Sequence, residues 1–172
     1  GYRSSPYSAD LATRTGQRRL VTLSDGSRLE LNTDTRVDIA YGPQERLIIL
    51  NQGEILLTTA ADRPSSRPLS VETPHGRILA LGTRFDVRLH SGFSTVDVLS
   101  HSVEVRPKDA PQQAQRVEEG QALTFGASQV GSLRPAPPGG SSWTQGLLVA
   151  NDWRLVDFAR ELARYRAGHL GC

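Results

Sequence analysis

A hairpin pattern is clearest in residues 20–31, which read LVTLSDGSRLEL. Apolar and polar residues alternate on both sides of Asp25-Gly26, and such alternation is typical of a strand with one buried face. Asp-Gly between alternating segments is the strongest short signal for a β-hairpin, because the tight turn it forms requires positive φ at both central positions. The sequence therefore predicts two antiparallel strands joined at this dipeptide.

The same alternation continues from Leu20 to about Phe125, and turn signals recur along it. These turn signals are Gln52-Gly53, Pro74-His75-Gly76, Ser91-Gly92 and Glu119-Gly120. No segment of helical periodicity interrupts the alternation. About ten short strands with hairpin-like connections predict a mainly β domain, built as an antiparallel sandwich or a roll-like stack.

The pattern changes after the β segment. Residues 134–142 read RPAPPGGSS, a composition typical of a linker. Apolar residues then recur at i, i+3, i+4, i+7 and i+10, which predicts one C-terminal amphipathic helix. Its apolar face would consist of Leu155, Phe158, Ala159, Leu162 and Tyr165. We therefore expect an N-terminal extension at 1–17, a β domain at 18–133, the linker, and a further piece at 143–172.

Composition narrows the class of protein. The 172 residues fit one domain with at most a small appendage, and 37% hydrophobic with 22% charged residues argues against disorder. Basic residues number 20 and acidic residues 18, so the net charge is only +2 and the charges are spread along the chain. A surface of mixed sign does not favour a nucleic-acid partner.

Motifs for metal binding and enzyme catalysis are missing from the sequence. The histidines at 75, 90, 101 and 169 fall in turns or at strand ends without metal-ligand spacing, and Cys172 is the only cysteine. We interpret the histidines as surface residues and expect no metal and no cofactor. The sequence holds no GxSxG motif and no glycine-rich phosphate loop, so a hydrolase is a weak alternative.

One dipeptide carries a possible reaction. Gly82-Thr83 lies within LGTRF (81–85), between two apolar β segments. The two residues could simply form a bulge or a bend. A threonine hydroxyl can also attack the carbonyl of the preceding residue when the backbone is strained, which gives an ester that water cleaves. Glycine at the preceding position tolerates the unusual φ and ψ that this step needs.

Several segments resemble, in order and spacing, the periplasmic domain of FecR-like transmembrane sensors. They are LSDGSRLELN (23–32), LNQGEILLTT (50–59), SVETPHGRILALGTRFDVR (70–88), TVDVLSHSVEV (95–105) and VEEGQALTF (117–125). The helix LVDFARELARY (155–165) resembles the start of the short domain, shared with secretins and TonB-dependent transducers, that often follows. On this resemblance, residues 143–172 would be such a domain cut short after its first helix. The family usually has glycine where His101 stands, so we expect a local loss of easy positive φ there.

The resemblance implies a regulator with three parts: a cytoplasmic sigma-binding segment, one transmembrane helix, and this domain on the periplasmic side of the inner membrane. The first two parts lie outside this sequence, and no apolar run here approaches the length of a membrane span. Such regulators bind the signalling domain of an outer-membrane siderophore transducer and control an extracytoplasmic-function sigma factor through a periplasmic protease. Some members cleave themselves at the dipeptide that corresponds to Gly82-Thr83.

The predicted C-terminal helix has two possible roles. The apolar face of the predicted helix could dock the transducer, with Trp143 and Trp153 as aromatic anchors beside Leu155, Phe158, Leu162 and Tyr165. The same face could instead close the core of the C-terminal domain.

The alternative function is a cell-surface carbohydrate-binding or adhesin-like β module. Such a module would need exposed aromatic side chains, and aromatic residues make up only 6% of the chain.

Overall fold

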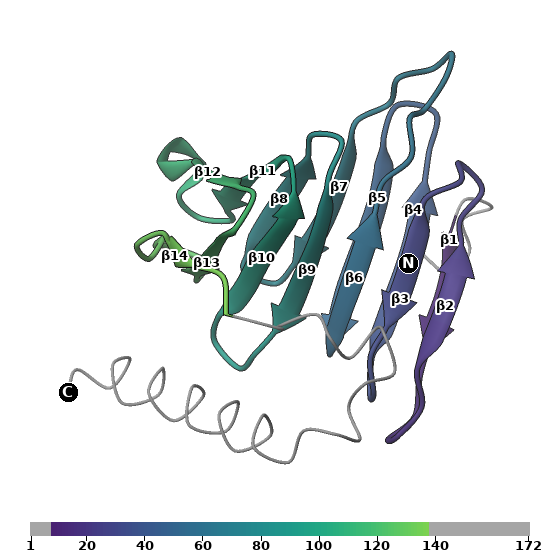
Figure 1. The fold of residues 1–172 in the computed structure, drawn as a ribbon, viewed down its shortest axis with the longest axis horizontal. Coiled ribbons are helices and arrows are strands. Elements are labelled where there is room, and N and C mark those ends of the chain that lie inside the picture. The colour runs from purple at the N-terminus through teal and green to yellow at the C-terminus, as the bar shows by residue number, and fades with distance from the viewer. Residues whose placement is uncertain (1–7, 138–172) are drawn as a thin grey trace. The chain divides into compact units, whose positions relative to one another are not determined.

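Two seven-stranded β-sheets form the described part of the protein, residues 8–137 of a computed structural model (Figure 1). We call them sheet A and sheet B. Sheet A has the order β1 (Ser8–Ala12), β4 (Arg36–Tyr41), β5 (Arg46–Gln52), β7 (Leu69–Thr73), β8 (Gly76–Ala80), β11 (Ser102–Pro107) and β12 (Gln115–Glu118). Sheet B has the order β14 (Arg134–Pro135), β13 (Gln121–Phe125), β10 (Ser94–Ser100), β9 (Arg84–Leu89), β6 (Glu54–Thr58), β3 (Arg28–Leu31) and β2 (Arg19–Thr22).

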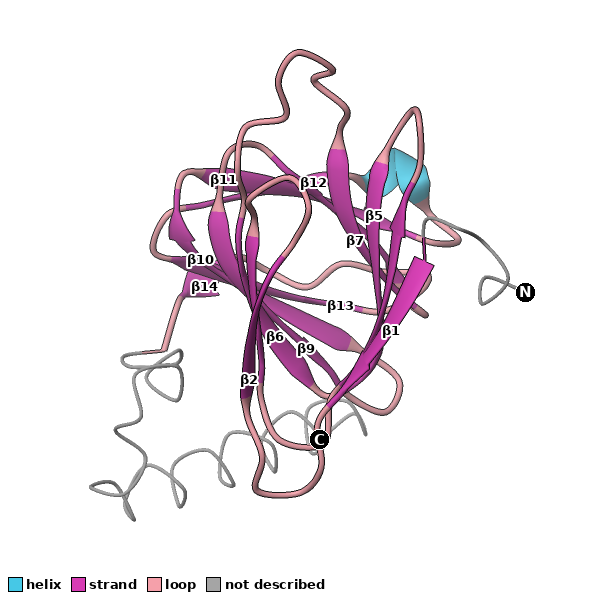
Figure 2. Ribbon diagram, turned by 90° about the vertical axis from the view of Figure 1, so that its right-hand side faces the viewer, coloured by secondary structure: helices cyan, strands magenta, loops and turns pink. Residues whose placement is uncertain are grey.

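The chain moves between the two sheets in short steps. Hairpins β2–β3, β9–β10 and β13–β14 belong to sheet B, whereas β4–β5, β7–β8 and β11–β12 belong to sheet A. The chain crosses between the sheets repeatedly, by short connections except for the ten residues between β6 and β7, so both sheets grow together along the sequence (Figure 2). This arrangement confirms the prediction of a mainly β domain, as two seven-stranded sheets.

The core lies between the sheets and is filled by alternate residues of nearly every strand. Its largest fully buried side chains include Phe85, Phe125, Ile48 and Leu123. Burial alternates along β4, where Val37, Ile39 and Tyr41 are buried and the residues between them are less so. The period of two predicted from the sequence is therefore the spacing that fills this core.

The predicted hairpin at Asp25-Gly26 is present, with a different turn. Gly26 has φ of +91°, but Asp25 does not have positive φ, so the turn is not of the mirror-image type expected. The backbone N–H of Gly26 donates to the carbonyl of Leu23 at 2.9 Å, and the Asp25 carboxylate accepts from the backbone N–H of Ser27 at 2.9 Å. The aspartate side chain thus replaces part of the turn's backbone bonding.

Two strands lie where no strand was predicted. Strand β1 lies within the predicted extension 1–17 and pairs antiparallel with β4, from Ser8↔Ala40 to Ala12↔Arg36. Strand β14 lies at the start of the predicted linker and pairs with β13. Both complete a sheet at its edge and are too short to show a period of their own, so the estimate of about ten strands was too low.

A further difference is one parallel pair. Among the described strands, β5 and β7 pair in parallel, from Arg46↔Leu69 to Ile49↔Glu72, and the other pairs are antiparallel. The pair arises because β6 of sheet B intervenes between them along the chain. Alternation alone cannot reveal this order.

The predicted C-terminal helix lies outside the described residues, as does most of the predicted linker. Within residues 8–137 the helical structure is a single 3₁₀ turn, Pro111–Gln113. No helix in that part of the chain has the length and apolar character needed to cross a membrane.

Candidate functional site

The Gly82-Thr83 dipeptide lies on the connection that carries the chain from β8 of sheet A to β9 of sheet B. Leu81 is 45% exposed and Gly82 is also exposed, whereas Thr83 is only 3% exposed. Gly82 has φ of +68°, a left-handed conformation that glycine adopts without steric cost. The peptide bond between the two residues therefore sits at the point where the chain enters the protein interior.

Hydrogen bonds hold Thr83 on every side. Its hydroxyl donates to the carbonyl of Ser102 through a short bond and accepts from the backbone N–H of Leu81 at 3.0 Å. Its own N–H donates to the hydroxyl of Thr59 at 2.9 Å, and its carbonyl accepts from the Thr59 N–H at 3.0 Å. The threonine therefore fastens the β8–β9 connection to two other segments of the chain.

The chemistry of the hydroxyl depends on what can take its proton. Attack on the Gly82 carbonyl requires deprotonation of the Thr83 oxygen, and the atom that accepts its hydrogen bond is a peptide carbonyl rather than a base. Two histidines that could take a proton make other bonds: His75 to Ser94 and His90 to Thr95. Asp86 lies three residues further along β9, about 10 Å in an extended strand. The observed arrangement thus orients the hydroxyl without showing a base.

His101 sits directly before the carbonyl that receives the Thr83 hydroxyl. It has φ of +62° at the turn between β10 and β11, which confirms that a residue with a side chain occupies a left-handed position there. Such a conformation costs an L-residue about 1–2 kcal/mol. The position of the Ser102 carbonyl therefore depends on a strained neighbour.

A second polar cluster joins the two sheets at one end of the sandwich. Asp25, in the β2–β3 turn, accepts from Arg46 Nη1 at 2.6 Å and from the Tyr41 hydroxyl at 3.1 Å. The side chain of Asp25 is 1% exposed and that of Arg46 is 9% exposed. Arg46 also donates to the carbonyls of Ala60 at 2.9 Å and Arg67 at 3.0 Å. This pair could not be predicted from local sequence patterns, because its partners lie 21 residues apart.

The charges of this cluster show in the pKa values of its members. Burial raises the pKa of Asp25, but hydrogen bonds from Ser27, Arg46 and Tyr41 together lower it more, so the carboxyl stays below its usual value. Burial and the neighbouring Asp25 charge raise the pKa of Tyr41. Asp62 belongs to the same cluster, with Oδ2 4.0 Å from Arg46 Nε, and bidentate side-chain bonds from Arg67 hold its pKa at about 2. All of these groups are thus in the ionisation state that the network needs at neutral pH.

Two histidines are not the surface residues that we predicted. His75 is 9% exposed, and its Nδ1 lies 2.8 Å from the hydroxyl of Ser94, which is fully buried. His90 is half-buried and stacks on Phe93 with ring centroids 4.4 Å apart. Burial, followed by the nearby positive charge of Arg88, lowers the pKa of His90 to about 4. Residues 8–137 contain no group of three potential ligands that could hold a metal ion.

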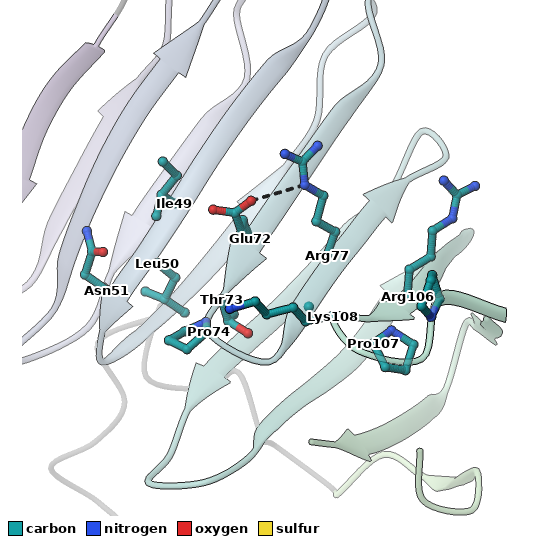
Figure 3. A pocket seen from close by; sticks show the side chains of 12 residues that line it. Ile49, Leu50, Asn51, Glu72, Thr73, Pro74, Arg77, Arg106, Pro107 and Lys108 are labelled. Atoms are coloured by element: carbon teal, nitrogen blue, oxygen red, sulfur yellow. Dashed lines mark hydrogen bonds and ion pairs between the residues drawn. The ribbon is translucent and has the colours of Figure 1, made fainter. Parts of the chain in front are cut away.

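Sequence reasoning also missed a groove on the outer face of sheet A. It lies where the β7–β8 hairpin turns, and its cationic side chains are Arg77, Arg106 and Lys108 (Figure 3). The strand registers bring these residues together, and register cannot be read from alternation alone.

The partner-binding residues predicted on the C-terminal segment all lie outside the described residues. They are Trp143, Trp153, Leu155, Phe158, Leu162 and Tyr165. Of the predicted site residues, the structure therefore describes Gly82 and Thr83, and the docking face stays a prediction.

Comparison with protein families identifies the family of this chain. The family described as "FecR protein" matches residues 9–104, which includes strands from both sheets. No curated protein matches the chain in sequence.

Solved structures share the fold. Two crystal structures, at 2.50 and 1.65 Å resolution, are of a protein from Parabacteroides distasonis ATCC 8503 described as a "putative anti-sigma factor". Each superposes with a TM-score of 0.68 at 22% identity, and the alignments cover 81% and 80% of this chain. The match spans 65% of the length of that protein, so the likeness is one of fold over part of a longer molecule.

Proposed function

Because the chain belongs to the FecR family, we propose that it is the periplasmic sensor domain of a transmembrane anti-sigma regulator. In this proposal the domain binds the signalling domain of an outer-membrane TonB-dependent siderophore transducer. Binding controls an extracytoplasmic-function sigma factor, which the regulator holds through a cytoplasmic segment, and a periplasmic protease transmits the signal. The domain turns over no metabolite.

One observation carries this proposal: the family match runs through residues 9–104, across strands of both sheets. The matched residues are thus most of the folded body rather than a short motif within it. The Parabacteroides distasonis protein with a similar fold is described as a "putative anti-sigma factor", which supports a regulatory role. A protein-binding role also suits two sheets that, within residues 8–137, end in edge strands, since an edge strand can accept an added strand.

A reporter experiment tests the proposal in cells. The regulator that contains this chain is expressed beside a sigma-dependent promoter reporter, with and without residues 8–137. We expect the intact regulator to respond to the ferric siderophore, and the shortened one to give a fixed output that the siderophore does not change. An unchanged siderophore response without these residues would refute the sensor role.

The C-terminal segment supplies the second part of the proposal. We expect Phe158 and Trp153 to help bind the transducer or to close a C-terminal core, and calorimetry with the transducer's signalling domain separates the two. Loss of affinity with unchanged stability in Phe158→Ala supports docking, whereas loss of stability with unchanged affinity supports a structural role. If both quantities stay unchanged in Phe158→Ala and in Trp153→Ala, neither account holds.

Self-cleavage at Gly82-Thr83 is a separate part of the proposal. The hydroxyl oxygen would bond to the Gly82 carbonyl carbon, the Gly82–Thr83 C–N bond would break with the nitrogen protonated, and water would hydrolyse the resulting ester. Three features support it: the left-handed φ of Gly82, the burial of Thr83, and the acceptor that orients its hydroxyl. The two fragments would stay together, because β8 pairs with β11 and β9 pairs with β6 across the break.

Mass spectrometry of the purified chain tests the reaction. We expect two fragments, residues 1–82 and 83–172, in a substantial fraction of the protein. Thr83→Ala should give one intact chain, because it lacks the nucleophile, while Thr83→Ser should retain some cleavage. A fully intact wild-type chain would exclude self-cleavage and leave the binding role unaffected.

The carbohydrate-binding alternative finds no support in the described part of the chain. Large hydrophobic side chains that are exposed there are Leu20, Leu81 and Leu133, and none is aromatic. Stacking on sugar rings would require an exposed aromatic platform.

A further inference from the structure

Buried polar groups join the two sheets at both ends of the domain. At one end Asp25 bonds to Arg46, and at the other His75, in the β7–β8 turn, bonds to Ser94, at the start of β10. Strand β9 runs from one end to the other, because its first residue pairs with Thr58 and its last residue pairs with Ser94. The two contacts between the sheets are therefore separated by the length of a strand.

The contact at His75 is a closed ring of hydrogen bonds. The backbone N–H of His75 donates to the Thr73 hydroxyl at 3.1 Å, and the Thr73 and Ser94 hydroxyl oxygens lie 2.9 Å apart. The Ser94 oxygen lies 2.8 Å from His75 Nδ1, and all three residues are buried. When the imidazole is neutral with its proton on Nε2, each hydroxyl of the ring donates one bond and accepts one. Every donor in the ring then has an acceptor.

A proton on Nδ1 of His75 breaks this balance. The nitrogen then donates to Ser94, and Ser94 turns its own proton toward Thr73, which already accepts from the His75 N–H. The Thr73 proton is left without an acceptor in the ring, and a buried donor without a partner is costly. The charge of the imidazolium is buried as well. The ring therefore favours neutral His75, and burial lowers the pKa of this residue.

His90 places a second imidazole at the same end. It follows β9 and stacks on Phe93, and its backbone N–H donates to the Phe93 carbonyl at 2.9 Å. Burial, followed by the charges of Arg88 and His75, lowers the pKa of His90. Because His75 acts on His90 from the other sheet, a charge on either ring opposes a charge on the other. We call Thr73, His75, His90 and Ser94 the histidine cluster.

Other charged groups at this end do not favour protonation. Glu54 of β6 pairs across the sheet with Arg88. Lys108 and Asp109 follow β11, and the backbone N–H of Lys108 donates to the His75 carbonyl at 2.9 Å. For neither histidine does a carboxylate in residues 8–137 offset the effect of burial on the pKa. A proton added here thus meets burial and positive charge.

The contact at the other end keeps its charges in mild acid. Burial raises the pKa of Asp25, but hydrogen bonds from Ser27, Arg46 and Tyr41 lower it more. Side-chain bonds from Arg67 hold the pKa of Asp62, in the same cluster, at about 2. Both carboxylates therefore stay ionised at pH 5. A fall in pH from 7.5 to 5.0 acts on one of the two contacts and leaves the other intact.

We propose that the histidine cluster is an acid-sensitive contact between the two sheets. Its neutral form holds the β7–β8 turn against the β9–β10 hairpin. Below about pH 6.5 the open form binds protons that the closed form excludes, so this end of the domain opens while the Asp25–Arg46 end stays joined. The inference goes beyond the proposed function and does not rest on it, because it concerns the domain alone.

Hydrogen exchange of single amides, followed by NMR on the complete 172-residue chain, tests the inference. The cluster amides are those of His75, His90 and Lys108, and the comparison amides are those of Ser27 and Ala60 at the other end. The pKa of His90 is about 4 in the closed form and should be near 6.5 in the open form. The open population should therefore rise about 30-fold between pH 7.5 and pH 5.0.

The two sets of amides should respond differently. After correction for the intrinsic exchange rate, protection of the cluster amides should fall about 30-fold or more, and that of the comparison amides less than about threefold. An equal fall in both sets would show a general loss of stability and overturn the inference. Unchanged protection of the cluster amides would also overturn it.

Substitutions that cannot titrate test the assignment to the two histidines. In His75→Asn the side-chain oxygen can replace Nδ1 as the acceptor from Ser94, and His90→Gln stays polar without a charge. The double variant should protect the cluster amides equally at both pH values, within about threefold. The matched control, His101→Asn, removes an exposed imidazole at the other end, and asparagine tolerates the left-handed φ there. A wild-type response in the double variant, or its loss in the control, would overturn the assignment.

A spectrum of the unmodified protein covers the case in which the double variant does not fold. In nitrogen-15 correlation spectra of the imidazole rings at pH 7.5, His75 should be neutral with its proton on Nε2, as the closed ring requires. As the pH falls, protonation of His75 should accompany the loss of protection at the cluster amides. A proton on Nδ1 at pH 7.5, or protonation of His75 with the amides still protected, would overturn the inference.

Discussion

Removal of the Arg46 side chain should destabilise the domain far more than removal of an exposed arginine. In Arg46→Met the Asp25 carboxylate stays buried with bonds from Ser27 and Tyr41 but loses its cation. The carbonyls of Ala60 and Arg67 lose their donors from Arg46 as well. Breaking a buried ion pair by removing one partner costs about 3–5 kcal/mol, and the carbonyls that lose a donor add to the cost of the lost charge. We therefore expect the free energy of unfolding to fall by about 4 kcal/mol.

Urea denaturation followed by circular dichroism measures this loss as a change in the free energy of unfolding. Arg77→Met is the control, because Arg77 also has two ion-pair partners but is 47% exposed. Exposed ion pairs contribute little, so the control should cost at most about 1 kcal/mol. Equal losses in the two variants would show that burial does not set the value of this pair.

A double-mutant cycle separates the ion pair from the packing of the arginine stem. Asp25→Asn combined with Arg46→Met should cost less than the sum of the two single changes by about 1–3 kcal/mol, because neither charge is then left alone. Additive losses would refute the coupling. The cluster then would stabilise the domain through its backbone bonds alone.

Two further predictions concern histidines. The pKa of about 4 for folded His90 lies below its usual 6.5, so the unfolded state binds more protons between these values and stability should fall as pH drops from about 6.5 to 4. His90→Gln should flatten the part of the denaturation-midpoint profile that this residue causes, and an unchanged slope would contradict the assignment. His101→Gly should raise the free energy of unfolding by about 0.5–1 kcal/mol, because glycine relieves the φ of +62°. A loss of stability in thermal melts would show that the imidazole makes a contact worth more than the strain.

The alternation of residues was sufficient to predict the strands that build the core. Val37, Ile39 and Tyr41 alternate with polar residues and are buried in the core, as their spacing predicts. Glycine positions also carried information. Gly53 has φ of +91°, and an added Cβ there would lie 2.3 Å from the Thr35 hydroxyl, so the predicted turn at that glycine has a steric cause.

Alternation says which face of a strand is buried but not which sheet the strand joins. The switch of the chain between sheets at Thr83, and the parallel pair β5–β7, are set by contacts between segments far apart in the sequence. Local patterns therefore predicted most of the strands and the mainly β class, and could not give the order of the strands in the sheets.

Polar groups were predicted less well than apolar ones for the same reason. His75 lies in a turn, which suggested that it is exposed. Instead its ring is buried, because the hydroxyl of Ser94 from the other sheet forms a hydrogen bond with Nδ1 and so offsets the cost of burying a polar group. The row that joins Arg77 to Arg106 needs two strand registers to be known. The Gly82-Thr83 junction was predicted from its own chemistry and from the family resemblance, and its hydrogen bonds to Ser102 and Thr59 were not.

Isothermal titration calorimetry between the 172-residue chain and the purified signalling domain of its transducer tests the central claim most directly. The account predicts a saturable one-to-one complex, with affinity high enough to give a clear inflection at micromolar protein. Signalling domains from transducers for unrelated siderophores should give weaker heats under the same conditions. Absence of any binding heat at saturating concentrations, with a chain shown to be folded by circular dichroism, would contradict the claim that this domain is a sensor for such a partner.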